Sequence, residues 1–334
     1  MNGKRIKLII IILIVSMPTI LKAQITVTQG TGTVRHLLET SFLGGGIDLD
    51  TLKPIIFNGN ATINSNQIGT FNNPTLSSPN MPIRNGIVMV TGACSDAGQG
   101  SHDGIQSTPA SPDLNGNDVS IALYNPYHGQ GGTQPMNDVA CLSFTVIPKS
   151  EQMSFKYAFA SEEYPGFVCS TYNDIFGLFV SGPYDENGNL VTTGGITPYQ
   201  YHNIALIPNS TTPVTINTVN GGVSAGSVTP CILTNTQYFI TNTNDNCYMN
   251  GYTKEFQTEV VSVIPCYRYK LELAICNIGD HLYNSAVYLA ANSFRANIVD
   301  VVDDNLLNHN NTVYTKGCSV DTLRIKANYT PTID

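Results

Sequence analysis

Short apolar segments that alternate with polar residues recur through much of this 334-residue chain. In the run MSFKYAFA, residues 153–160, Phe155, Tyr157 and Phe159 fall on one face of an extended chain, as in a half-buried β-strand. Helical periodicity is almost absent, and Gly, Pro, Asn and Asp separate the segments. The sequence therefore predicts an all-β fold, a jelly-roll-like β-sandwich with long loops. The clearest expected strands are 140–146, 153–160, 174–180, 203–207, 213–219, 237–241, 255–264, 267–275 and 285–290.

The regions outside these strands have weaker signals. Residues 37–43 precede three glycines and predict one short N-terminal helix. Residues 95–137 are dense in Gly, Pro, Ser, Asp and Gln, which indicates a long loop region. The sandwich domain is expected over residues 24–297 and a linker over residues 298–311. Residues 312–334 are too few to bury a core, so they are expected to be the incomplete start of a further extracellular β-domain.

The first 23 residues have the pattern of a secretory signal peptide. Lys4, Arg5 and Lys7 precede an apolar run at residues 8–15, and Ala23 is the small residue that a signal peptidase needs before its cut. The uninterrupted run is shorter than the ~20 residues of a membrane-spanning helix. We therefore expect a secreted or cell-surface protein, with no transmembrane segment after the signal.

The charge composition limits the partners of the chain. Charged residues make up 12% of it and the net charge is −8, with no cluster of Lys or Arg after the signal. Nucleic acid is excluded as a partner because its recognition needs a basic stripe. An excess of carboxylates in an extracellular protein is compatible with binding of a hard cation such as Ca²⁺.

The chain has eight cysteines, and disulfides are the default in an exported protein. Cys266 and Cys276 bracket an expected strand about 33 Å long, whereas the Cα atoms of a disulfide lie within about 7 Å. That pair is therefore excluded. Cys231 and Cys247 flank a loop-rich stretch and are the candidate pair. No Cys/His cluster supports a zinc site.

The densest polar cluster follows the aromatic strand at residues 153–160. Carboxylates and amides occur there within a short span, and a second group lies between the last two expected strands. Calcium takes six to eight oxygens from such groups in loops, whereas Asp and Asn also commonly cap turns without any metal. Both interpretations stay open. The candidate calcium ligands are Glu162, Glu163, Asn173, Asp174, Asp280 and Asn284.

Two motifs of common hydrolases are missing: the chain has no HExxH and no P-loop. A glycosidase needs two facing carboxyl groups about 5 to 9 Å apart. Glu162 and Glu163 are adjacent, so on an extended chain they point to opposite faces. A secreted glycan-acting hydrolase would therefore have to combine Glu162 or Glu163 with Asp174 or Asp280.

The run FKYAFASEEYPGFVCSTYNDIFGLFVSGP, residues 155–183, resembles the choice-of-anchor L domain, a module of bacterial surface and secreted proteins. Further similarity gives a coverage of about residues 26–297. Where the family usually has acidic residues, this chain has Asn250 and Asn284, and each loss of charge would weaken a calcium site. The resemblance implies a location and an architecture but no established activity.

The leading hypothesis is a non-catalytic extracellular module that is stabilised by calcium and used in adhesion or in binding a glycan or protein surface ligand. The alternatives are the glycan-acting hydrolase and a structural spacer in a multidomain surface protein. An enzyme should place two carboxylates in an open cleft with aromatic platforms. A calcium module should instead direct several oxygens to one point about 2.4 Å away.

Overall fold

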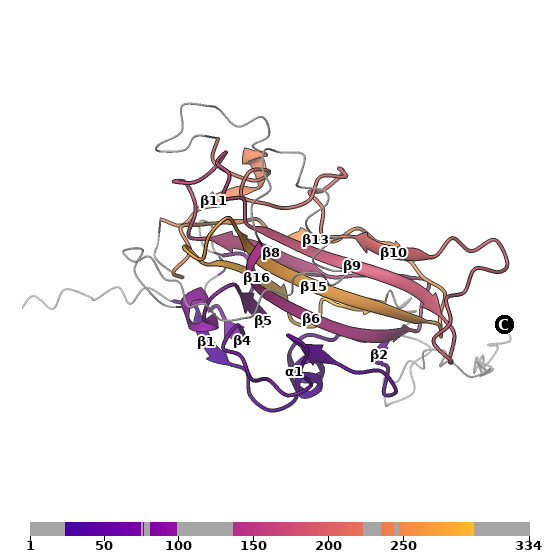
Figure 1. The fold of residues 1–334 in the computed structure, drawn as a ribbon. Helices are drawn as coiled ribbons and strands as arrows, with labels where there is room; N and C mark the ends of the chain where they lie inside the picture. The colour runs from indigo at the N-terminus through magenta and orange to yellow at the C-terminus, as the bar shows by residue number, and fades with distance from the viewer. Residues whose placement is uncertain are drawn as a thin grey trace, which may run out of the picture.

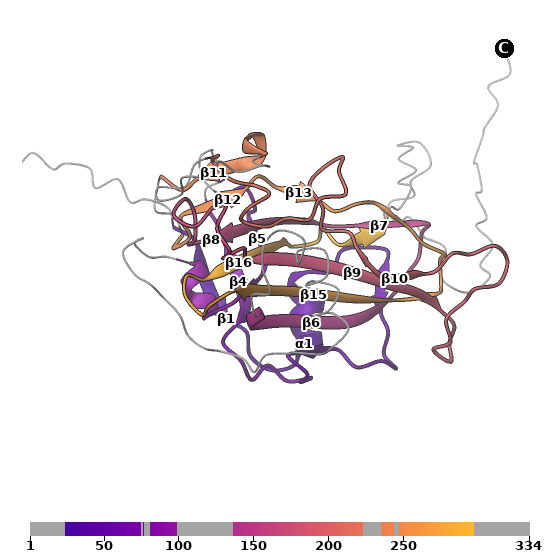
Figure 2. The same ribbon diagram turned by 45° about the horizontal axis from the view of Figure 1, so that its top comes forward.

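The computed structural model describes residues 24–74, 76, 81–98, 136–222, 235–243 and 247–296. In this part of the chain the fold is an all-β sandwich with one short helix, α1 (Val34–Ser41), as the sequence predicted. Figures 1 and 2 show its two large sheets as stacked layers. The predictions for residues 1–23, 298–311 and 312–334 fall outside the described residues.

Two large antiparallel sheets and one small sheet make up the sandwich. The eight-stranded sheet has the order β1 (Thr26–Gln29), β4 (Ile68–Asn72), β5 (Asn85–Val90), β16 (Ser285–Ala290), β8 (Lys156–Ser161), β12 (Gly251–Thr253) and β11 (Phe239–Thr241), with β13 (Phe256–Gln257) also on β8. The six-stranded sheet has the order β10 (Tyr199–Asn203), β9 (Ile175–Tyr184), β15 (Arg268–Ile278), β6 (Met136–Pro148) and β2 (Ile47–Leu49), with β3 (Ile56–Phe57) also on β6. The small sheet consists of β14 (Val261–Ser262), β7 (Gln152–Ser154) and β17 (Arg295–Ala296).

Two of the connections that cross between the two large sheets lie side by side at one end of the sandwich. The chain leaves the eight-stranded sheet after β8 and enters the six-stranded sheet at β9, and it returns from β15 to β16. In the register, Ser161 lies opposite Ser285 and Ile175 lies opposite Cys276. The connections after β8 and after β15 are therefore neighbours in space, although more than a hundred residues separate them in the sequence.

The main core lies between the sheets. Phe155, Tyr157 and Phe159 point into it, as their alternation predicted, and Phe155 packs edge to face with Phe42 and Phe294. The opposite face of β8 is buried as well. Its small residues Ala158 and Ala160 belong to a second apolar cluster that contains large aromatic residues from neighbouring strands, including Tyr252 and Tyr288.

The expected strands at 140–146, 174–180, 267–275 and 285–290 are confirmed within β6, β9, β15 and β16. The strand expected over residues 213–219 is wrong. There the Thr218 hydroxyl accepts a hydrogen bond from the Thr215 backbone N–H and donates to the Pro213 carbonyl, which closes a turn instead. The segment 255–264 forms only the short β13 and β14. Helix α1 begins at Val34 rather than residue 37 because the Thr33 side chain caps it.

The predicted Cys231–Cys247 pair is not formed. Cys247 is a buried free thiol, and Cys231 lies outside the described residues. Cys169 is disulfide-bonded. The loop-rich stretch between residues 231 and 247 suggested a local pair, but Cys247 instead packs into the second apolar cluster. The free cysteines of the described residues are Cys94, Cys141, Cys247, Cys266 and Cys276.

These five thiols should differ sharply in reactivity. Burial raises the pKa of Cys94 to about 11 and of Cys141 and Cys247 to about 12, and it raises the pKa of Cys276 well above the usual value. Only Cys266 is partly exposed. Alkylation of the native protein, mapped by peptide mass spectrometry, is expected to label Cys266 first and the other four only after denaturation. Fast labelling of the other four in the native protein would contradict this burial.

Candidate functional site

Acidic residues gather where the chain crosses between the sheets. Glu162 and Glu163 directly follow β8, Asp174 directly precedes β9, and Asp280 lies between β15 and β16. Because these strand ends are neighbours, the connections bring residues 162–174 and 279–284 together. We call Glu162, Glu163 and Asp174, the three carboxyl groups that are most deeply buried in these two connections, the buried acidic cluster.

Glu162 is 3% exposed and is tied to the other connection. Its Oε2 accepts a hydrogen bond from the backbone N–H of Asn284 at 2.8 Å, and its own N–H donates to the Asn284 carbonyl at 3.0 Å. Its Oε1 is buried and has no hydrogen-bond partner among the described residues. Burial, with a smaller contribution from the charge of Asp96, raises the pKa of Glu162 to about 8.

Glu163 and Asp174 form the inner pair of the cluster, with exposed fractions of 2% and 0%. The Asp174 oxygens accept hydrogen bonds from the Ile278 N–H at 2.9 Å and from the Ser285 hydroxyl at 2.6 Å. Glu163 Oε2 is buried without a partner among the described residues. Burial raises the pKa of Asp174 to about 8 and that of Glu163 well above its usual value, and the charges of Asp174 and Asp280 raise the latter pKa further. Neither carboxyl ionises easily without a nearby positive charge.

The other three predicted ligands have structural contacts of their own. Asn284 is 1% exposed and donates its side-chain amide to Asp96 at 3.0 Å. Asn173 accepts a hydrogen bond from the Asn217 N–H, and Asp280 accepts one from the Leu282 N–H, each at 2.9 Å. Asn173 and Asp280 therefore act as loop and turn acceptors, whereas Asn284 connects Glu162 to a third segment of the chain.

Sequence reasoning missed Asp96, Asp138 and Asn277. Asp96 lies in a short 3₁₀ helix, η1 (Cys94–Ala97), and Asp138 lies at the start of β6 and is 2% exposed. Asp138 contacts His281 Nδ1 at 3.0 Å and accepts a hydrogen bond from the Asn277 amide at 3.2 Å. Asn277 Oδ1 is buried without a partner among the described residues. The only signal in the sequence was an acidic residue at the start of an apolar strand.

The unpartnered polar atoms at this end of the sandwich are oxygens. In the described part of the chain, no three His, Cys, Asp or Glu side chains come together as a group that could hold a metal ion, calcium included. Five buried side-chain oxygens of the described residues have no partner: Glu162 Oε1, Glu163 Oε2, Asn277 Oδ1, Asn242 Oδ1 and the Tyr157 hydroxyl. Calcium accepts neutral amide and carbonyl oxygens beside carboxylates, whereas zinc prefers nitrogen and sulfur.

The geometry offers little to the hydrolase alternative. Of the four carboxylates that it would use, Glu162, Glu163 and Asp174 are at most 3% exposed, and only Asp280 is partly exposed. An open cavity of about 510 Å³ lies elsewhere, and Glu272 is the one acidic residue among its described lining residues. At neither place do the carboxylates named for the hydrolase form an exposed pair among the described residues.

The fold and the buried acidic end define an all-β sandwich module. The chain belongs to the choice-of-anchor L domain family, whose model matches residues 26–295. The family is a type of surface-associated module of bacterial surface or secreted proteins. No curated protein and no solved structure has significant similarity to the chain. No helix among the described residues is long and apolar enough to cross a membrane.

Proposed function

We propose that the protein is a non-catalytic extracellular recognition module, used in adhesion or ligand binding, whose acidic end binds calcium. The observation that carries the calcium part is the pair of buried carboxylate oxygens without partners, Glu162 Oε1 and Glu163 Oε2. An acidic residue in a loop can also accept a backbone hydrogen bond, as Glu162 Oε2 does from the Asn284 N–H, but each such oxygen then has a hydrogen-bond donor. These two oxygens have none among the described residues.

The electrostatic cost of the cluster supports a cation. Burying an ionised carboxylate without a partner costs several kcal/mol, and buried charges are normally paired or coordinate a metal. The described residues bring no Lys or Arg into contact with Glu162, Glu163 or Asp174. A divalent cation would supply the missing charge and let these carboxyls ionise near neutral pH.

The bound calcium would hold two connections together. Glu162 and Glu163 come from the connection after β8, and Asn277 and Asn284 come from β15 and the connection after it. Glu163, whose charged neighbours are Asp174 and Asp280, would supply the carboxylate from one connection and Asp280 that from the other, with Asp174 held in place by Ile278 and Ser285. The ion would thus stabilise the loops at one end of the sandwich rather than take part in a reaction.

Isothermal titration of the metal-free protein with CaCl₂ tests this proposal. We expect a dissociation constant of about 10⁻⁴ to 10⁻³ M, as in other extracellular calcium modules. Glu163→Gln should weaken binding at least tenfold, because it keeps the shape of the side chain and removes its charge. The matched control is Glu186→Gln in an exposed turn, which should bind as the unmodified protein does. Absence of calcium binding to the unmodified protein, or equal binding to Glu163→Gln, would refute the site.

A further inference from the structure

A second feature lies on the outer face of the six-stranded sheet. A cavity of about 510 Å³ opens there, within the range of small-molecule sites. Its floor is formed by β6 and β15, where Ser143 lies opposite Glu272 and Thr145 opposite Lys270. Glu272 is six residues before the end of β15, so the acidic end of the sandwich is roughly 20 Å away along the strand.

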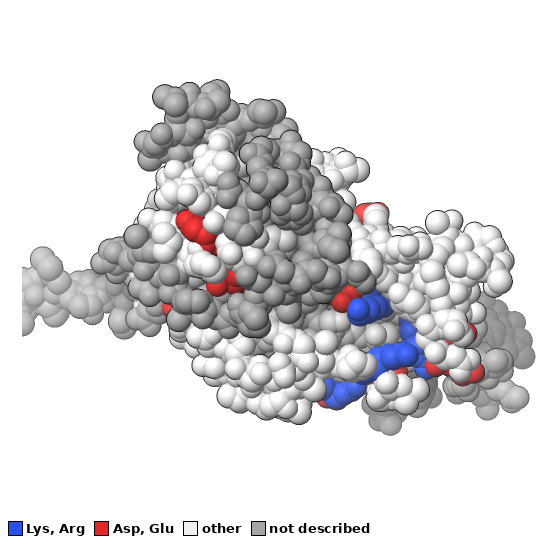
Figure 3. Space-filling view, viewed as in Figure 1, with Lys and Arg blue, Asp and Glu red and all other residues white. Residues whose placement is uncertain are grey.

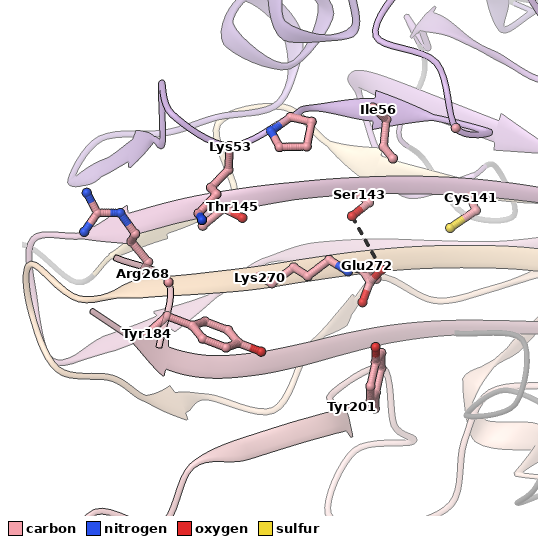
Figure 4. Close-up of a pocket in the computed structure, with 13 residues that line it drawn as sticks. Lys53, Ile56, Cys141, Ser143, Thr145, Tyr184, Tyr201, Arg268, Lys270 and Glu272 are labelled. Atoms are coloured by element: carbon pink, nitrogen blue, oxygen red, sulfur yellow. Dashed lines mark hydrogen bonds and ion pairs between the residues drawn. The ribbon is translucent and has the colours of Figure 1, made fainter. Parts of the chain in front are cut away.

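The walls of the cavity come from segments on either side of this floor. Lys53 and Ile56 lie on one side, and Tyr184 and Tyr201 lie on the other, each half-buried. Figure 4 shows the two tyrosine side chains below the floor strands and Lys53 above Thr145, with Arg268 toward the same end as Lys53. The cavity therefore has an aromatic side, a polar floor and a cationic end.

The charges of the cationic end are only partly balanced. Lys270 is paired with Glu272 at 2.7 Å, and Arg268 donates from Nε to the buried carboxylate of Asp50 at 2.8 Å. The two Nη groups of Arg268 and the amine of Lys53 have no hydrogen-bond or ion-pair partner among the described residues. Figure 3 shows Lys and Arg side chains gathered on this face, in a protein whose net charge is −8.

We propose that this cavity binds an acidic saccharide through a uronate carboxylate. The Arg268 Nη groups and the Lys53 amine would hold the carboxylate, because guanidinium and ammonium groups form charge-assisted hydrogen bonds with it. The Tyr184 and Tyr201 rings offer flat apolar surface to a sugar ring. Ser143, Thr145 and Glu272 supply the hydroxyl and carboxylate partners that sugar hydroxyls need.

An acidic peptide would satisfy the cationic end equally well, but it would not use the remainder of the cavity. The polar floor provides both donors and acceptors on one sheet face, and this suits a ring with several hydroxyl groups. The inference rests on the recognition function proposed above and names its ligand class. It does not depend on calcium, since none of the cavity residues belongs to the acidic end.

The test uses a matched pair of probes and the whole protein in calcium-containing buffer. A β-1,4-linked glucuronic acid tetrasaccharide and cellotetraose share their linkage and ring geometry and differ in the carboxylate. By isothermal titration at low salt, we expect binding of the acidic probe that is at least tenfold tighter than that of the neutral one. Lys53→Gln and Tyr201→Ala should each weaken it at least fivefold, whereas Lys254→Gln, an exposed lysine outside the cavity, should not.

Three results would overturn the proposal: no binding of the acidic tetrasaccharide, equal binding to Lys53→Gln, or tighter binding of a tetraglutamate peptide. The melting temperature of each variant, measured in the same buffer, shows that it is folded. If the unmodified protein binds calcium but not the acidic tetrasaccharide, only the saccharide site is refuted. If the unmodified protein binds the acidic tetrasaccharide but not calcium, only the metal site is refuted.

Discussion

Raising the pH from about 5 to about 8 in the presence of EDTA is expected to lower the melting temperature of the protein by roughly 10 °C. Burial holds the folded-state pKa values of Glu162 and Asp174 at about 8, above the ordinary values of 4.5 and 3.8. Between these limits the unfolded chain has released protons that the folded protein still binds. Stability is therefore complete below about pH 4 and is lost as the pH rises through the folded-state values.

Calcium should reverse this loss, because it replaces the proton as the partner of the ionised carboxylates. At about pH 8 and saturating CaCl₂, we expect the melting temperature to recover by several degrees, consistent with about 2.7 kcal/mol at a hundred times the dissociation constant. The other titratable groups near the cluster are Asp96, Asp138, Asp280 and His281.

Scanning calorimetry of the unmodified protein and of Glu162→Gln isolates the contribution of one carboxyl. The variant should lose less stability between about pH 5 and about pH 8, because its amide does not titrate. The melting temperature of the unmodified protein in EDTA could instead stay constant or rise between about pH 5 and about pH 8. That result would show that ionising the buried carboxyl groups does not destabilise the fold.

Gly92→Ala is expected to destabilise the protein by about 3 kcal/mol, at the upper end of overpacking costs. A Cβ at this position would lie 2.6 Å from the Cγ and Nδ2 atoms of Asn284, which is 1% exposed. The methyl group would displace the amide that donates to Asp96 and would shift the backbone N–H that donates to Glu162. The effect should therefore combine a steric clash with the loss of hydrogen bonds.

A double-mutant cycle separates this clash from a general effect of alanine. Asn284→Ala removes the atoms that a Cβ at position 92 would meet, so Gly92→Ala should cost under about 1 kcal/mol in that background. Urea unfolding of the four proteins gives the coupling free energy. Equal costs in the two backgrounds would show that Asn284 does not pack against Gly92 as the structure has it.

The sequence predicted the all-β class of the fold well because the alternation of apolar and polar residues is a local signal. Alternation in residues 153–160 placed Phe155, Tyr157 and Phe159 on one buried face, and strands such as Ser285–Ala290 agree with their apolar runs. It failed at residues 213–219, where an apolar pattern occurs in a turn held by the Thr218 hydroxyl. It also failed for Cys247, because a cysteine's partner depends on distance in space rather than on separation along the chain.

For the candidate site, the sequence by itself determined that carboxylates and amides cluster after two strands, at Glu162, Glu163 and Asp174 and near Asp280. Only the tertiary structure decided which of them are buried, which oxygens have no partner, and that Asp96, Asp138 and Asn277 join them. The physical reason is that the chain crosses between the two large sheets at this end of the sandwich. Pairing of β8 with β16 and of β9 with β15 places distant connections side by side and withdraws their carboxylates from water.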